Sequence, residues 1–80
     1  GPQKLKFTYQ EKKDYETIES DIATLEERIE KLESEMAAVS TDFVKLNQIM
    51  ADKEAAENML EEKMDRWMYL EELAARIAEQ

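Results

Sequence analysis

The sequence contains no cysteine and no histidine, and its single glycine and single proline are the first two residues. Without cysteine, the chain can form neither a disulfide nor a thiolate-ligated metal site. It also lacks a glycine-rich phosphate loop, a histidine base and any pair of carboxylates that a cleft could enclose. These absences exclude the common catalytic chemistries, so we expect no enzymatic activity, no metal site and no cofactor in this chain.

Long hydrophobic runs are absent too, because the longest wholly apolar stretch is only a few residues. The sequence therefore has no candidate membrane span, and it shows no signal-peptide pattern. Basic side chains are few, with 11 against 20 acidic ones, and the net charge is −9. Such a chain repels phosphate backbones overall, so binding to nucleic acid requires a local basic patch.

What the sequence does contain is helical periodicity. Apolar residues recur at alternating intervals of three and four in residues 15–39, and less regularly in residues 46–77. This spacing averages about 3.5 residues and places the side chains on one narrow stripe of an α-helix, as in a helix that packs on another helix. We call the two facing stripes the seam, and Phe43 continues the second stripe. The predicted seam residues are Tyr15, Ile18, Ile22, Leu25, Ile29, Leu32, Met36, Leu46, Ile49, Ala56, Leu60, Trp67 and Leu70.

The predicted fold is all-α: a two-helix antiparallel coiled-coil hairpin with a short N-terminal extended segment. Residues 8–80 would form the hairpin, with helices at about 9–38 and about 43–78 joined by a turn at about 39–42. Residues 1–7 are interpreted as a leader and linker, and the first two match what a protease leaves after tag removal.

Three local signals place the helix ends. Thr8 and Glu11 fit a capping box, which starts the first helix at Tyr9. Ser, Thr and Asp at positions 40–42 are each good N-caps, and the sequence does not choose among them. No glycine is available to end the first helix in a left-handed conformation, so we expect a tightened 3₁₀ turn there.

The short turn also sets the register of the two helices. A turn centred near residue 41 pairs residues whose numbers sum to about 82, which places Leu25 opposite Ala56. The open end of the hairpin, opposite the turn, is called the base here. We expect Leu5 to pack on the base, where an aromatic cluster is predicted from Tyr15, Trp67, Phe7, Tyr9 and Tyr69.

Basic residues concentrate at the same end. Four lysines and one glutamate occupy residues 1–13, a local net charge of +3, which leaves −12 for the rest of the chain. An alternative interpretation pairs Arg66 with Glu62 and Arg76 with Glu72, each four residues apart, and leaves an ordinary mixed-charge surface. If this end contacts phosphate instead, the candidate residues are Lys4, Lys6, Lys12, Lys13 and Arg66, and the contacts would not read bases.

Two motifs carry a resemblance to a known family. Residues 5–11 (LKFTYQE), followed by the start of the seam, resemble the opening of the C-terminal domain of ABC-F proteins. Residues 65–73 (DRWMYLEEL) are similar to the Arg-Trp-x-x-Leu-Glu signature of that domain. The resemblance covers residues 4–75. ABC-F proteins are soluble ATPases with two ATP-binding cassettes and no membrane domain, and they act on ribosomes.

The resemblance implies a cytoplasmic, non-catalytic accessory domain, which in the family is an antiparallel coiled coil with a 3₁₀ element and binds DNA in some members. ATP and magnesium would belong to the cassettes of the parent ATPase, whose motifs this chain lacks. The implied partners are DNA, ribosomal RNA or the ribosome, together with the rest of the parent, and we expect a monomer. The alternative function is a structural protein–protein interaction or dimerisation coiled coil that uses Met68, Tyr69 and the aromatic base.

Overall fold

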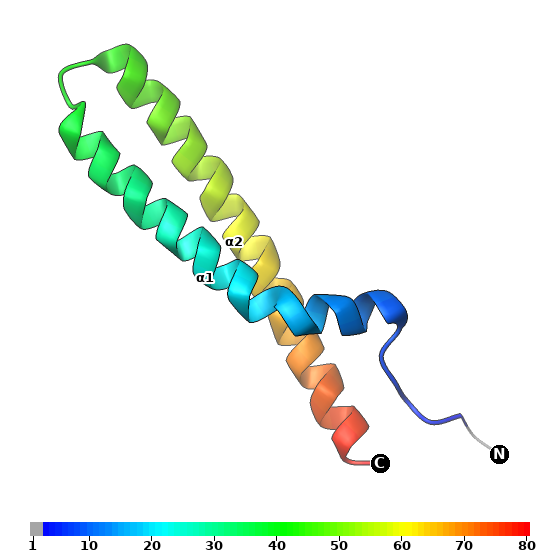
Figure 1. Ribbon diagram of the computed structural model, residues 1–80. Helices are drawn as coiled ribbons and strands as arrows, with labels where there is room; N and C mark the ends of the chain where they lie inside the picture. Colours follow the sequence, from blue (N-terminus) through cyan, green and yellow to red (C-terminus); the bar gives the residue numbers. More distant parts are fainter. Residues whose placement is uncertain (1–2) are drawn as a thin grey trace.

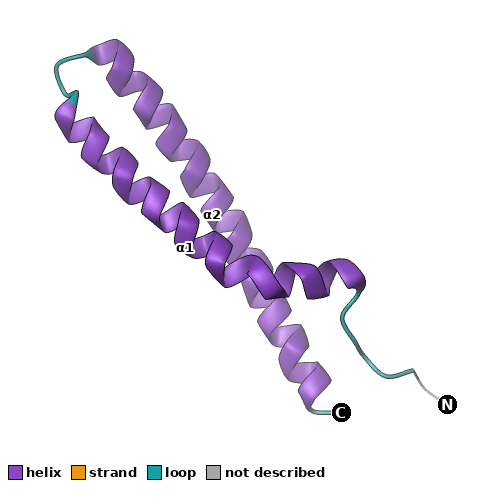
Figure 2. Cartoon of the chain, in the orientation of Figure 1, coloured by secondary structure: helices purple, strands orange, loops and turns teal. Residues whose placement is uncertain are grey.

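The computed structural model describes residues 3–80, which form two long antiparallel helices joined by a short turn (Figure 1, Figure 2). Helix α1 spans Tyr9–Ala38 and helix α2 spans Phe43–Ala78. The molecule is a thin rod with principal extents of 67 × 16 × 14 Å. The predicted all-α helical hairpin is thus confirmed. Gly1 and Pro2, which the sequence suggests are a tag remnant, lie outside the described residues.

The start of α1 is fixed by the predicted capping box. The hydroxyl oxygen of Thr8 accepts a hydrogen bond from the backbone N–H of Glu11 at 3.1 Å. In return, the carboxylate of Glu11 accepts from the backbone N–H of Thr8 at 2.8 Å. Two backbone donors that a helix start leaves without partners are satisfied in this way, so the helix begins at Tyr9 as expected.

Helix α1 ends without a glycine, and a hydrogen bond shared between two carbonyls tightens its last turn. The backbone N–H of Val39 donates both to the carbonyl of Glu35 at 3.2 Å and to that of Met36 at 3.3 Å. The second bond spans three residues, as in the expected tightened turn, but no 3₁₀ helix forms within residues 3–80. The backbone N–H of Asp42 then donates to Val39 at 2.9 Å and closes the turn. Asp42 is the N-cap, because its carboxylate accepts from the N–H of Lys45 at 3.2 Å.

The seam forms the only apolar layer between α1 and α2 in the described chain. Ile18, Leu32, Ala56 and Leu70 are buried, with 0–5% of their surface exposed. Every other predicted seam residue is at least half-buried. Phe43 is the exception to the second stripe: it is 73% exposed, because it begins α2 at the turn, beyond the end of α1. Two helices bury one stripe each, so the length of the seam, rather than the volume of a core, supplies the stability.

Cross-helix ion pairs report the register directly. Lys63 Nζ lies 3.3 Å from a carboxylate oxygen of Asp21, and Lys53 Nζ lies 3.4 Å from one of Glu33. The residue numbers of these pairs sum to 84 and 86, close to the expected value of about 82. Both lysines interrupt the apolar stripe of α2 and are half-buried, so their alkyl stems cover apolar surface while the ammonium groups reach the facing helix. Within residues 3–80, neither helix has a stretch long and apolar enough to span a membrane.

Candidate nucleic-acid interface

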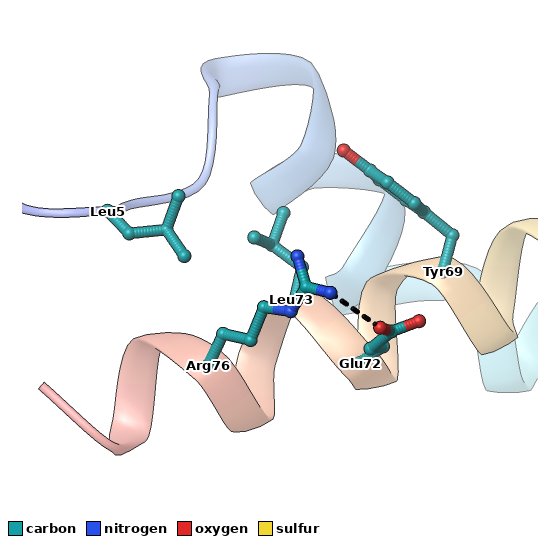
Figure 3. A pocket seen from close by; sticks show the side chains of 5 residues that line it. All are labelled: Leu5, Tyr69, Glu72, Leu73 and Arg76. Carbon is teal, nitrogen blue, oxygen red and sulfur yellow. Dashed lines mark hydrogen bonds and ion pairs between the residues drawn. The ribbon is translucent and has the colours of Figure 1, made fainter.

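The extended N-terminal segment lies against the last turns of α2 at the base of the hairpin (Figure 1). The backbone N–H of Leu5 donates to the side-chain oxygen of Gln80, and the side-chain amide of Gln80 donates to the carbonyl of Leu5 at 2.7 Å. This pair of bonds mimics one rung of a β-ladder and fixes the segment. Leu5 also lines a shallow pocket with Tyr69, Leu73 and other side chains of α2 (Figure 3). Lys4 and Lys6, on either side of Leu5, are therefore held at the base.

Acidic and aromatic side chains join the first turns of α1 to α2. The hydroxyl of Tyr69 donates to a carboxylate oxygen of Glu11 at 2.7 Å, across 58 positions of the sequence. The hydroxyl of Tyr15 donates in the opposite sense, from α1 to the carboxylate of Glu71 at 3.0 Å. Each bond gives a charged acceptor a neutral donor, and such bonds are stronger than bonds between two neutral groups. The base is thus held together by polar bonds as well as by the seam.

These contacts shift the ionisation of the groups that form them. The backbone N–H of Thr8, and then the Tyr69 hydroxyl, hold the pKa of Glu11 below its ordinary value of 4.5. The Gln10 amide, and then Arg66, lower the pKa of Asp14 below 3.8. Both carboxylates therefore stay ionised at neutral pH. Hydrogen bonds to Glu71 and Glu11 raise the pKa values of Tyr15 and Tyr69, respectively, above 10.0, so these hydroxyls remain donors.

The lysines of the same segment face solvent. Lys4, Lys6, Lys12 and Lys13 are all exposed, and none of them forms an ion pair with a carboxylate in residues 3–80. The carboxylates of Glu11 and Asp14 are held by the cap and by α2. The four lysine side chains are exposed beside them.

Arg66 differs from these four lysines. Its Nη2 and Nε atoms each lie 3.2 Å from the same carboxylate oxygen of Asp14. Its guanidinium carbon also lies 5.3 Å from the ring centroid of Tyr69. The pairing of Arg66 with Glu62, one of the sequence interpretations, is wrong, because Arg66 reaches across the seam instead. Arg76, ten residues further along α2, does pair with Glu72 at 2.9 Å, as that interpretation predicts.

The aromatic cluster is smaller than predicted. The rings of Phe7 and Tyr15 lie 5.2 Å apart, centroid to centroid, and are tilted by 35°. Trp67 is half-buried, and its indole nitrogen is buried without a hydrogen-bond partner in residues 3–80. Tyr69 is 49% exposed; its hydroxyl binds Glu11, and its ring lies beside the guanidinium of Arg66 rather than against another aromatic ring of residues 3–80. Tyr9 is not a member of the cluster: it is 76% exposed, and the ammonium of Lys13 lies 5.4 Å from its ring centroid.

Sequence reasoning missed these cross-helix polar bonds, although one signal was available. Glu11 falls on the continuation of the seam, where an apolar residue is expected, and the capping box accounts for only part of its role. A carboxylate on the seam also predicts a facing donor, and Tyr69 supplies it from α2. A capping residue can thus serve both its own helix start and the neighbouring helix.

The fold and the base together define a helical-hairpin module. The turn closes one end, and the N-terminal segment, hydrogen-bonded to the end of α2, covers the other. A family model for ABC transporter C-terminal domains matches residues 6–72, and the chain belongs to this family. The chain is also 40% identical over 65 residues to a Bacillus subtilis (strain 168) protein named "Uncharacterized ABC transporter ATP-binding protein YfmR". That match covers 81% of this chain and 10% of the relative, so the chain spans about a tenth of the relative's length. No solved structure matches.

Proposed function

We propose that this chain is the non-catalytic accessory domain of a cytoplasmic ABC-F ATPase and that it binds nucleic acid, either DNA or the RNA of the ribosome. The assignment to an ABC-family ATP-binding protein supports the first part, and the motifs at residues 5–11 and 65–73 support the ABC-F subtype. ATP and magnesium would then be bound by the cassettes of the parent. The remainder of that parent is the other expected partner.

One observation carries the nucleic-acid part: four exposed lysines within ten positions have no carboxylate partner among residues 3–80, in a chain whose net charge is −9. Elsewhere such a chain repels phosphate, so this segment is where a polyanion would be attracted. Lysine is a point charge without a fixed donor geometry, which suits contacts to phosphate rather than to base edges. Arg66, the fifth predicted contact, would act by neutralising Asp14 next to the lysines.

Binding of labelled DNA and RNA oligonucleotides at low salt, followed by fluorescence anisotropy, tests this proposal. The variant Lys12→Gln plus Lys13→Gln should weaken binding to every sequence. Each lost phosphate contact should also flatten the slope of log K against log salt by about 0.9 for duplex DNA.

The matched control is Arg28→Gln plus Lys31→Gln, which removes two exposed positive charges from the middle of α1. Both variants change the net charge equally, so only a local patch makes the first weaker than the second. Equal affinities for the two variants, or no salt-dependent binding by the unmodified chain, would rule the interface out.

A second candidate function is protein binding without nucleic acid, either to a second copy or to another protein. The supporting observation is that Met64 and Met68, one helical turn apart on α2, are 45% and 65% exposed. Sedimentation at two concentrations tests the dimer. A concentration-dependent dimer that Met68→Glu dissociates would favour this function, whereas a monomer at both concentrations would argue against self-association.

A further inference from the structure

The most exposed of the large apolar side chains in residues 3–80 is Tyr9, at 76%. It is the first residue of α1, and it lies outside the aromatic contacts that close the base. Exposing this ring to water gives up the favourable burial that Phe7 and Tyr15 obtain from each other. The position of Tyr9 is therefore not explained by the stability of the hairpin.

The surroundings of Tyr9 are cationic. The ammonium of Lys13, four residues after Tyr9, lies 5.4 Å from the ring centroid, and Lys12 is three residues after Tyr9. Lys6 precedes Tyr9 by three residues and lies in the extended N-terminal segment. The two carboxylates that follow Tyr9 most closely in the sequence, on Glu11 and Asp14, are engaged by Tyr69 and Arg66 of α2.

We infer that Tyr9 is a stacking platform for an unpaired base, and that the lysine-rich segment selects single-stranded nucleic acid or an unpaired loop over a duplex. This inference rests on the proposed function of the same lysines. An exposed aromatic ring among cations is the arrangement that binds single strands, since the ring takes a base face while the cations take the adjacent phosphates. In a duplex the base faces are already stacked on one another, so the ring would gain nothing without unstacking them.

Phe43 provides a matched control within the same chain. It is also the first residue of its helix and also an exposed aromatic residue, at 73%. It lies at the turn, at the opposite end of the rod from the lysines (Figure 1). Truncating either ring leaves a surface position at a helix start, where alanine is compatible with the helix.

The experiment compares a labelled mixed-sequence single strand with the duplex of the same length, for four forms of the protein: unmodified, Tyr9→Ala, Tyr9→Phe and Phe43→Ala. Tyr9→Ala should weaken single-strand binding roughly 5- to 10-fold, the lower part of the range for losing one stacked base. Its affinity for the duplex should change less than about twofold. Tyr9→Phe, which keeps the ring, and Phe43→Ala should both bind the single strand as the unmodified protein does.

The outcomes separate this inference from the function it rests on. If the lysine variant loses binding while Tyr9→Ala binds both probes normally, the interface stands and the stacking role is wrong. The stacking role is also overturned if Tyr9→Phe loses as much as Tyr9→Ala, because the hydroxyl would then be the contact. If the unmodified protein binds neither probe, the interface itself is wrong, and the inference falls with it. Circular dichroism of each variant confirms that the hairpin is intact.

Discussion

The guanidinium of Arg66 holds the carboxylate of Asp14 from the facing helix, with Nη2 and Nε each 3.2 Å from one oxygen and 52 positions of sequence between the two residues. The side chains are 36% and 31% exposed, so this pair sits at the edge of the seam, partly out of water. The same contact engages the carboxylate of Asp14, the acid that follows Lys12 and Lys13 in the sequence. One ion pair thus joins the two helices at the base and leaves the neighbouring lysines as the outward-facing charges.

The first prediction follows from that geometry. Arg66→Gln should lower the urea midpoint of unfolding more than Arg76→Gln does. The Arg76–Glu72 pair is about two-thirds exposed and lies within one helix, and such pairs contribute only about 0.2–0.5 kcal/mol. Arg66 instead connects two helices, so its loss removes a tertiary contact and leaves Asp14 facing a polar but uncharged residue. Equal midpoints for the two variants, measured by circular dichroism in urea, would contradict a structural role for Arg66.

The second prediction concerns Leu70, the seam residue one helical turn after Arg66 on α2. Leu70 is 0% exposed, so Leu70→Ala removes fully buried methyl groups and should cost about 3 kcal/mol of unfolding free energy. The control is Met68→Ala two residues away, at a side chain 65% exposed, which should change stability by less than about 0.5 kcal/mol. If Leu70→Ala leaves no folded baseline, Ile18→Val should still fold and cost about 1 kcal/mol. Similar costs for Leu70→Ala and Met68→Ala would mean that the seam is placed on the wrong face of α2.

The seam was predictable because it depends on a repeat of apolar residues over many turns. Each side chain at this spacing adds to the same stripe, so an error at one position does not move the others. The start of α1 was predictable for a different reason, since a capping box is a contact between residues three positions apart. The exposure of Phe43 shows where periodicity stops being informative: the stripe continues past the point where the facing helix ends.

The base was harder to predict because its contacts are not local. The usual i to i+4 rule gives Arg66 a partner in Glu62, yet the flexible side chain reaches Asp14 once the two helices are in register. Tyr9 is a second case in which the sequence does not predict the surroundings of a side chain. An aromatic residue near the seam is expected to be buried, but the helix begins at Tyr9 with its ring on the outer face, beside Lys13. Side-chain partners across two helices depend on register and on rotation, which a single sequence fixes only approximately.

A third prediction tests the capping residue that the sequence left open among three candidates. Asp42→Ala should cost about 1 kcal/mol, because the carboxylate accepts from the N–H of Lys45, which would otherwise have no partner in the helix. Asp42→Asn should retain most of the stability, since its side-chain oxygen can accept the same bond. Thr41→Ala is the control at the neighbouring position and should be nearly neutral. A larger cost for Thr41→Ala than for Asp42→Ala in thermal and urea unfolding would move the N-cap by one residue.

The fourth prediction is a pH dependence at Asp14. Hydrogen bonding by Gln10, and then by Arg66, keeps the folded-state pKa of Asp14 below its ordinary value of 3.8. A carboxylate whose pKa is lowered by folding stabilises the folded state above its unfolded pKa, and this contribution is lost as the pH falls through the folded pKa. Asp14→Asn should therefore be less stable than the unmodified protein above about pH 4, and the gap should close at lower pH.

The gap between the two proteins has to be measured, rather than the stability of either one, because a second effect acts in the opposite direction. Acid also neutralises the other carboxylates of a chain with a net charge of −9, which relieves repulsion along both helices. That relief is common to the unmodified protein and to Asp14→Asn, so it cancels in the difference. As a control, the background Gln10→Ala plus Arg66→Gln removes the two hydrogen-bonding groups that lower the pKa and leaves only the weaker effect of the Lys63 charge. Asp14→Asn should therefore have a much smaller effect in that background at any pH. Urea unfolding at a series of pH values measures both gaps, and a gap that persists or widens below pH 3.8 would show that the ionised form of Asp14 does not stabilise the base.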